Sequence, residues 1–207
     1  MRRLTAPCVF KLREKASVFL TELHPARDAE ARAAVLTTLR KRDHDATHHC
    51  SAWREGVPVA AWGADDDGEP SGTAGGPMLR VLEGAGATDL IAVCIRWFGG
   101  TKLGSGGLVR AYTEGVQGAL AEADAQGLWE EVRALRRGAI LSDPASAHLP
   151  FAVFGAFPDL RILDQGFRDG QASVRFELPL GQEGALEHQW RERSRGGAIE
   201  WEPAGHS

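Results

Sequence analysis

A continuous apolar segment, a glycine-rich loop and an alanine-rich segment follow one another between residues 89 and 124. The apolar segment, 89–97, is typical of a central strand that is covered on both faces. Five glycines lie within the next ten residues, and glycine at this density marks tight turns or a close approach of another group to the backbone. The residues from about Gly107 to Asp124 then predict a helix. The order of strand, loop and helix is the first constraint on the fold.

The segments before residue 130 predict further strands and helices around this unit. The expected elements are strands over 9–20, 50–53 and 57–62 and helices over 28–42 and 73–84. Asp28 and Thr73 are the predicted N-caps of the two helices, because their side-chain oxygens accept hydrogen bonds from free amides. Together with the central strand and its helix, these elements predict an α+β domain over residues 1–130.

The composition changes near Gly127, and a second set of short elements follows. We expect strands over 139–141, 160–167, 172–180 and 198–202 and helices over 147–156 and 183–193. The dipeptide Asp169-Gly170 between two of these strands is a hairpin signal. The resulting β-α-β-β-α-β order predicts a small ferredoxin-like domain over residues 138–207.

Composition and charge narrow the class of protein. The net charge of −4 disfavours a protein that coats nucleic acid by charge alone, although a local basic face is compatible with it. Cys8, Cys50 and Cys94 are widely spaced and form no CxxC pair, as expected in a reducing cytosol. No apolar run approaches the roughly 20 residues that cross a bilayer. We therefore expect a cytoplasmic protein without a membrane segment.

Two glycine-rich loops are predicted to form one anion-binding site. Each leads into a helix, whose first amides have no acceptor within the helix, and the helix dipole adds positive charge there. Glycine leaves these amides open to a phosphate. The predicted anion- or RNA-binding residues are Arg96, Gly99, Gly100, Lys102, Gly104, Ser105, Gly106, Gly107 and Arg110. The supporting residues are Asp66, Asp67, Glu69, Ser71, Gly72, Thr73 and Gly75 of the upstream loop and His48.

The same residues are open to other interpretations. The glycines would also be explained by tight turns and close helix packing. The acidic loop either takes part in metal or catalytic chemistry or accepts hydrogen bonds from turn amides and pairs with nearby arginines. An EF-hand is excluded, because Pro70 and Gly76 occupy the positions where it needs glycine and glutamate. His48 and Cys50 share a strand face but lack a complementary ligand pair for zinc. We expect no metal, no cofactor and no catalytic residue.

Three segments resemble the IMPACT/YigZ family. Asp66–Gly75 reads DDGEPSGTAG, as in the family. Arg96–Tyr112 resembles the family segment R-Y-F-G-G-x-x-L-G-x-G-G-L-x-R-A-Y with Trp97 in place of tyrosine, and Ala46–Ala52 matches A-x-H-x-C-x-A. The resemblance covers about residues 8–125. One departure is Val18, because the family has a lysine or arginine between the flanking serine and phenylalanine.

The resemblance implies the fold of ribosomal protein S5 domain 2 for the first domain and, as in bacterial members, a ferredoxin-like second domain. It also implies a link to translation, because the second domain is similar to a module of a translation elongation factor and eukaryotic members act in translational control through protein partners. These implications favour a non-enzymatic, translation-associated regulatory protein that binds RNA, the ribosome or an acidic partner through a glycine-lined basic groove. The alternative is a hydrolase or phosphotransferase that uses the acidic loop on a phosphate-bearing substrate.

Overall fold

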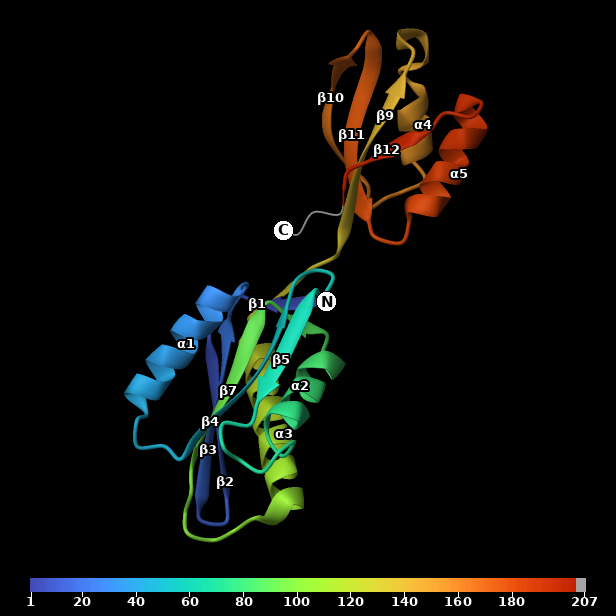
Figure 1. Cartoon of the computed structure of the whole chain (residues 1–207). Helices are drawn as coiled ribbons and strands as arrows, with labels where there is room; N and C mark the ends of the chain where they lie inside the picture. The colour runs from blue at the N-terminus through green and yellow to red at the C-terminus, as the bar shows by residue number, and fades with distance from the viewer. Residues whose placement is uncertain (204–207) are drawn as a thin grey trace. The chain divides into compact units, whose positions relative to one another are not determined.

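The computed structural model describes residues 1–203, and the chain divides into two units, Met1–Val132 and Arg133–Ser207. Each unit combines helices with antiparallel strands (Figure 1). The predicted α+β class is therefore confirmed. Within residues 1–203, no helix has both the length and the apolar character needed to cross a membrane.

The main sheet of the first unit has five antiparallel strands in the order β2-β3-β7-β4-β5. Their bounds are Cys8–Glu14 for β2, Ser17–Pro25 for β3, His48–Glu55 for β4, Ala61–Asp65 for β5 and Leu90–Trp97 for β7. Every residue of β7 before Trp97 is buried, as its continuous apolar sequence predicts. A small second sheet joins β1 (Arg2–Leu4), β6 (Ala87–Thr88) and β8 (Trp129–Glu131).

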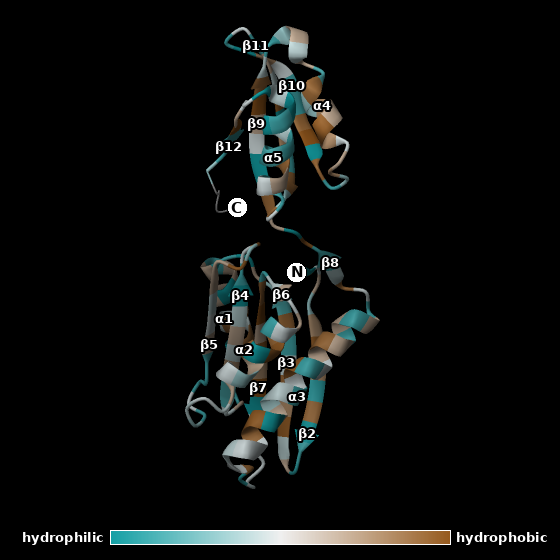
Figure 2. Ribbon diagram, turned by 90° about the vertical axis from the view of Figure 1, so that its right-hand side faces the viewer, coloured by the Kyte–Doolittle hydropathy of each residue, from teal (hydrophilic) through white to brown (hydrophobic). Residues whose placement is uncertain are grey.

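Helices cover both faces of the main sheet. On one face lies α1 (Ala29–Arg42), and its first turn is capped by the Asp28 carboxylate, which accepts a hydrogen bond from the Ala31 amide at 2.7 Å as predicted. On the other face lie α2 (Gly75–Gly84) and α3 (Gly104–Ala125), drawn in front of the sheet in Figure 2. Alternate residues of the strands supply the two cores, since successive side chains point to opposite faces. Helix α3 begins at Gly104, earlier than the sequence predicted.

The second unit has the predicted β-α-β-β-α-β order. Its elements are β9 (Leu135–Ser142), α4 (Leu149–Phe154), β10 (Arg161–Arg168), β11 (Gln171–Pro179), α5 (Glu183–Ser194) and β12 (Ile199–Trp201), with a short 3-10 turn over Pro144–Ser146. The sheet order is β10-β11-β9-β12. Asp169 and Gly170 both have positive φ, 55° and 81°, as a tight hairpin between β10 and β11 requires.

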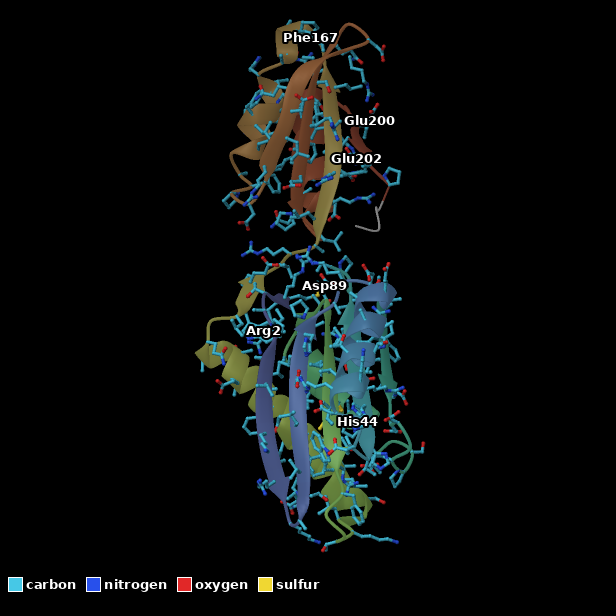
Figure 3. The ribbon with its side chains drawn as sticks, turned by 90° about the vertical axis from the view of Figure 1, so that its left-hand side faces the viewer. Arg2, His44, Asp89, Phe167, Glu200 and Glu202 are labelled. Atoms are coloured by element: carbon cyan, nitrogen blue, oxygen red, sulfur yellow. The ribbon has the colours of Figure 1, made fainter. Side chains whose placement is uncertain are left out.

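The face of this sheet that the helices leave uncovered is polar. Alternate pairs between β9 and β11, such as Ala139 with Arg175, place their side chains on it. Two of its arginines are paired with carboxylates of the chain's C-terminal strand segment. Arg175 bonds Glu202 at 2.8 Å, and Arg168 bonds Glu200 at 2.5 Å (Figure 3). The positive charge of these two arginines is therefore compensated within the unit.

Candidate functional site

The two glycine-rich loops lie at the same end of the main sheet. β7 leads into the loop 98–103 and β5 leads into the loop 66–74, and both strands end where β4 begins because both are antiparallel to it. The tip of the β2–β3 hairpin lies at this end too (Figure 1). The two segments are joined by an ion pair between Arg96 and Glu69, whose nitrogen and oxygen atoms are 2.5 Å apart.

This ion pair is the centre of a buried polar cluster. The side chains of Glu69 and Arg96 are only 3% and 5% exposed. The Tyr112 hydroxyl donates to the same Glu69 oxygen at 2.7 Å, and Arg96 also donates to the Ser17 hydroxyl at 3.3 Å. His48 completes the surroundings, with its Nε2 3.9 Å from Glu69 Oε1.

Arg96 was expected to face a bound anion, and in the structure its guanidinium group faces the Glu69 carboxylate. A buried charge is stable only when it is paired and hydrogen-bonded, and Glu69 supplies both functions. The guanidinium group therefore holds the acidic loop against the end of β7, and it does not belong to the exposed cations of the unit.

The N-terminus of α2 already carries an anion, the carboxylate of Asp66. It accepts hydrogen bonds from the amides of Gly72, Ala74 and Gly75 at 2.7, 3.0 and 2.9 Å. Partial burial raises the pKa of Asp66, but the three amide bonds outweigh it, so the pKa lies below its ordinary value. The prediction that Thr73 caps this helix is wrong, because its hydroxyl donates to the Pro70 carbonyl and Ala74 occupies the N-cap position.

Asp67, His48 and Cys50 connect the acidic loop to the start of β4. The Asp67 carboxylate accepts a hydrogen bond from the His49 amide at 2.6 Å and forms an ion pair with Arg40 at 2.6 Å. His48 Nδ1 lies 2.8 Å from the Asp67 carbonyl oxygen. The Cys50 thiol is buried, bonds the Tyr112 hydroxyl at 3.2 Å, and has a raised pKa because burial disfavours the thiolate. These bonds agree with the interpretation that the acidic residues serve the turn.

The N-terminus of α3 differs from that of α2. No side chain caps it, and Leu103 occupies the N-cap position. Gly104, with φ of 74°, and the next two residues, Ser105 and Gly106, are exposed. Lys102 precedes this turn and Arg110 follows it, both exposed, and within residues 1–203 neither forms an ion pair. The free amides and both charges therefore face solvent.

The loop 98–103 is fixed by close packing on the β2–β3 hairpin. A Cβ atom at Gly99 would lie 1.9 Å from the Ala16 carbonyl oxygen, so only glycine fits there. The Lys15 ammonium group lies 3.5 Å from the Lys102 carbonyl oxygen. Gly75 is enclosed in the same way, with a Cβ position 2.7 Å from the Asp65 nitrogen.

Most of the remaining predicted loop residues lie at this end of the unit with open space around them. A Cβ atom at Gly100, Gly104 or Gly106 would meet no atom within 4 Å, whereas one at Gly107 would be 3.1 Å from the Leu103 Cβ. Ser71 and Gly72 are exposed in the acidic loop. Thus some of the glycines are explained by packing, and Gly106 is not.

A group of cations on the β2–β3 hairpin lies outside the residues predicted for the site. Lys11, Arg13 and Lys15 are exposed, and within the part of the chain that the structure describes they form no ion pair. The spacing of Lys11 and Arg13, two residues apart on one strand, was the available signal, because it places both side chains on one face; Lys15 follows in the turn. Val18, where the resemblance expects a cation, is the cross-strand partner of Arg13.

The family model of the Impact N-terminal domain matches residues 15–120, which is just over half of the chain and includes every residue of the two loops. An α+β unit with a five-stranded sheet, two helices on one face and these loops at one end is thus the form that this domain takes here. The chain belongs to the Impact N-terminal domain family.

Curated relatives are similar over the same region. IMPACT family member YigZ of Escherichia coli (strain K12) is 46% identical over 114 residues, which cover 54% of this chain and 56% of the relative. IMPACT family member YvyE of Bacillus subtilis (strain 168) is 44% identical over 100 residues, covering 48% and 46%. The chain thus matches about half the length of these curated relatives.

A solved structure extends the likeness to both units. It is a crystal structure described as a hypothetical protein, 30% identical to this chain. The comparison covers 100% of this chain and 98% of the other, with a TM-score of 0.60. The two-domain α+β fold is therefore shared along the whole length.

Proposed function

We propose that the protein is a non-enzymatic, translation-associated regulatory protein that binds RNA through the exposed N-terminus of α3. In this proposal Lys102 and Arg110 contact phosphate groups, and the amides of Gly104, Ser105 and Gly106 donate hydrogen bonds to a phosphate at the start of the helix. The link to translation rests on the family resemblance, and the cytoplasmic location rests on the widely spaced cysteines, which suit a reducing cytosol. RNA is the partner that unpaired cations beside free amides suit best.

The observation that carries the proposal is the contrast between two helices of one unit. The dipole of α2 is neutralised by Asp66, whereas α3 has neither a capping side chain nor a carboxylate in its first turn. Lys102 and Arg110 have no counter-ion within residues 1–203, and the positive end of the helix dipole lies between them in the sequence, so all three favour an anion. A phosphate group would satisfy both the amides and the cations.

The alternative, a hydrolase or phosphotransferase, needs a free carboxylate or base. Asp66, Asp67 and Glu69 all accept two or more hydrogen bonds or ion pairs from the protein. Their geometry therefore favours a structural role for the acidic loop, and no specific contact favours the enzymatic alternative.

Unit 2 is proposed to contribute to partner recognition rather than to the electrostatic attraction of RNA. Three of the arginines on its open sheet face, Arg137, Arg168 and Arg175, are each paired with a carboxylate. Exposed aromatic side chains are the usual partners of bases on such a sheet, and Phe167, which is 76% exposed, lies on β10 beside the helices instead. This arrangement suits a protein partner better than a base.

The test is RNA binding at several salt concentrations, measured by anisotropy with a labelled structured RNA and the full chain. Binding should weaken steeply with salt, and the Lys102→Glu/Arg110→Glu variant should bind more weakly with a smaller salt dependence. The matched control is Arg27→Glu/Arg80→Glu, which makes the same charge change at exposed positions away from the loop. Absent or salt-insensitive binding by the unaltered chain would overturn the proposal and leave a protein partner.

A further inference from the structure

The β2–β3 hairpin presents a row of side chains that α1 leaves uncovered. Phe10 of β2 packs on Gly118 of α3, so the residues of β2 that alternate with it face the opposite side of the sheet. Lys11 and Arg13 therefore lie on the α1 side. We call this side of β2, with its neighbours Val18 and Trp97, the hairpin face.

The hairpin face is open because α1 covers only part of its side of the sheet. Leu39 and Val35 of α1 pack over Ile91, Val93 and Ile95 of β7. The edge strand β2 lies beyond this contact, and its residues Lys11 and Arg13 are exposed. In Figure 3, which views this side, the helix lies over the inner strands, and β2 and β3 are uncovered.

An aromatic ring lies in the same row as the cations. Arg13 pairs with Val18 on β3, and Val18 pairs with Trp97 on β7. Side chains of directly paired residues share a face, so the row Arg13, Val18 and Trp97 crosses three strands. Arg13 and the half-buried ring of Trp97 are two strand spacings apart, a distance of about 10 Å. Lys11 and Arg13 are about 7 Å apart along β2.

Among the residues that the structure describes, no carboxylate is paired with Lys11 or Arg13 of the hairpin face. Glu22, the carboxylate on this side of β3, is already bonded by Arg42 at 2.5 Å and by His24 at 2.9 Å. Glu14 lies on the α3 side of β2, since it is an even number of residues from Phe10. Lys15 at the hairpin tip adds a further cation beside the loop 98–103.

We propose that the hairpin face binds single-stranded RNA, with phosphate groups on Lys11 and Arg13 and a base against Trp97. Proteins that bind single strands combine cations that follow the backbone with aromatic rings on which bases stack, and this face has both in one row. The inference rests on the proposed function and extends it. In this inference the RNA strand continues past Lys15 to the N-terminus of α3. The cations of the hairpin face and the cations Lys102 and Arg110 then bind one RNA molecule.

The test uses a fluorescein-labelled uridine 12-mer and the full chain, with affinity measured at several salt concentrations. Lys11→Glu/Arg13→Glu should weaken binding by on the order of tenfold or more at low salt and reduce the slope of log K against log salt by about 1.4, which is two phosphate contacts at about 0.7 each. An abasic 12-mer of the same length should bind the unaltered chain on the order of tenfold more weakly, because it lacks the stacking base.

The Arg27→Glu/Arg80→Glu control should bind as the unaltered chain does, and circular dichroism should report the same fold for all variants. If Lys102→Glu/Arg110→Glu weakens binding but Lys11→Glu/Arg13→Glu does not, the inference that RNA binds the hairpin face is refuted and the proposed function stands. If the unaltered chain shows no salt-dependent binding to any RNA, the proposed function fails and this inference fails with it. Equal affinity for the uridine and abasic strands would refute the contact between Trp97 and a base.

Discussion

Replacing Glu69 with glutamine tests whether its ion pair with Arg96 holds the acidic loop in place. The substitution removes the negative charge but leaves an amide oxygen that can still accept the Tyr112 hydroxyl. Both charged side chains are at most 5% exposed and their atoms are 2.5 Å apart, so Arg96 would keep a buried charge without a counter-ion. Breaking a buried pair in this way costs about 3–5 kcal/mol, and an effective dielectric constant of 20 gives about 4 kcal/mol for charges 4 Å apart.

The assay is urea unfolding of the full chain. Unfolding is monitored by hydrogen exchange of the β7 amides, so that the measurement reports on the first unit. Glu69→Gln should lower the free energy of unfolding by about 3 kcal/mol or more. The control is Asp124→Asn, which breaks the pair with Arg2 at 2.5 Å where the Asp124 side chain is 50% exposed, and it should cost less than about 1 kcal/mol. The double variant Glu69→Leu/Arg96→Met should lose much less than the sum of its single variants. A loss below about 1 kcal/mol for Glu69→Gln would refute this reasoning.

Three further substitutions separate structural from functional residues. Asp66→Asn should lower the free energy of unfolding by about 1 kcal/mol near neutral pH. The pKa of Asp66 in the folded protein is lowered from 3.8, so the stability that its carboxylate contributes is present above pH 3.8 and is lost as the pH falls through the folded pKa. In acid, the unaltered chain and the variant should therefore unfold at the same urea concentration. Gly99→Ala should destabilise by about 1–3 kcal/mol in the same assay, since its Cβ would overlap the Ala16 carbonyl. Gly106→Ala should stabilise α3 by about 0.5–1 kcal/mol in a thermal melt and weaken RNA binding, whereas a destabilised variant would mean that this glycine is structural.

Local patterns predicted most of the elements of the fold. The apolar run of β7, the cap of α1 by Asp28 and the hairpin at Asp169-Gly170 each depend on residues that are near one another in the sequence. The order of elements in the second unit follows from the same kind of signal. Boundaries were less accurate, as at the start of α3, because the glycines at Gly104 and Gly106 disfavour a helix that the surrounding packing nevertheless forms.

Contacts between distant residues were the part that the sequence did not reveal. The cap of α2 comes from Asp66, nine residues before Gly75, although the rule for caps considers the residue next to the helix. Arg96 finds its partner 27 residues away, so its charge was visible in the sequence but its burial was not. Charges of opposite sign in two loops indicate that they meet, and they do not indicate which of them remain exposed.

The uncapped start of α3 needs an explanation other than stability. A side-chain cap contributes about 1 kcal/mol, and the same unit uses one at α1 and a carboxylate at α2. At α3 the chain has Leu103 in place of a cap, glycine at two of the first three helical positions and unpaired cations nearby. Each of these choices weakens the helix start on its own. Local departures from stable design are expected where a ligand completes the structure, and a phosphate group at these amides would supply the missing cap and neutralise Lys102 and Arg110 together.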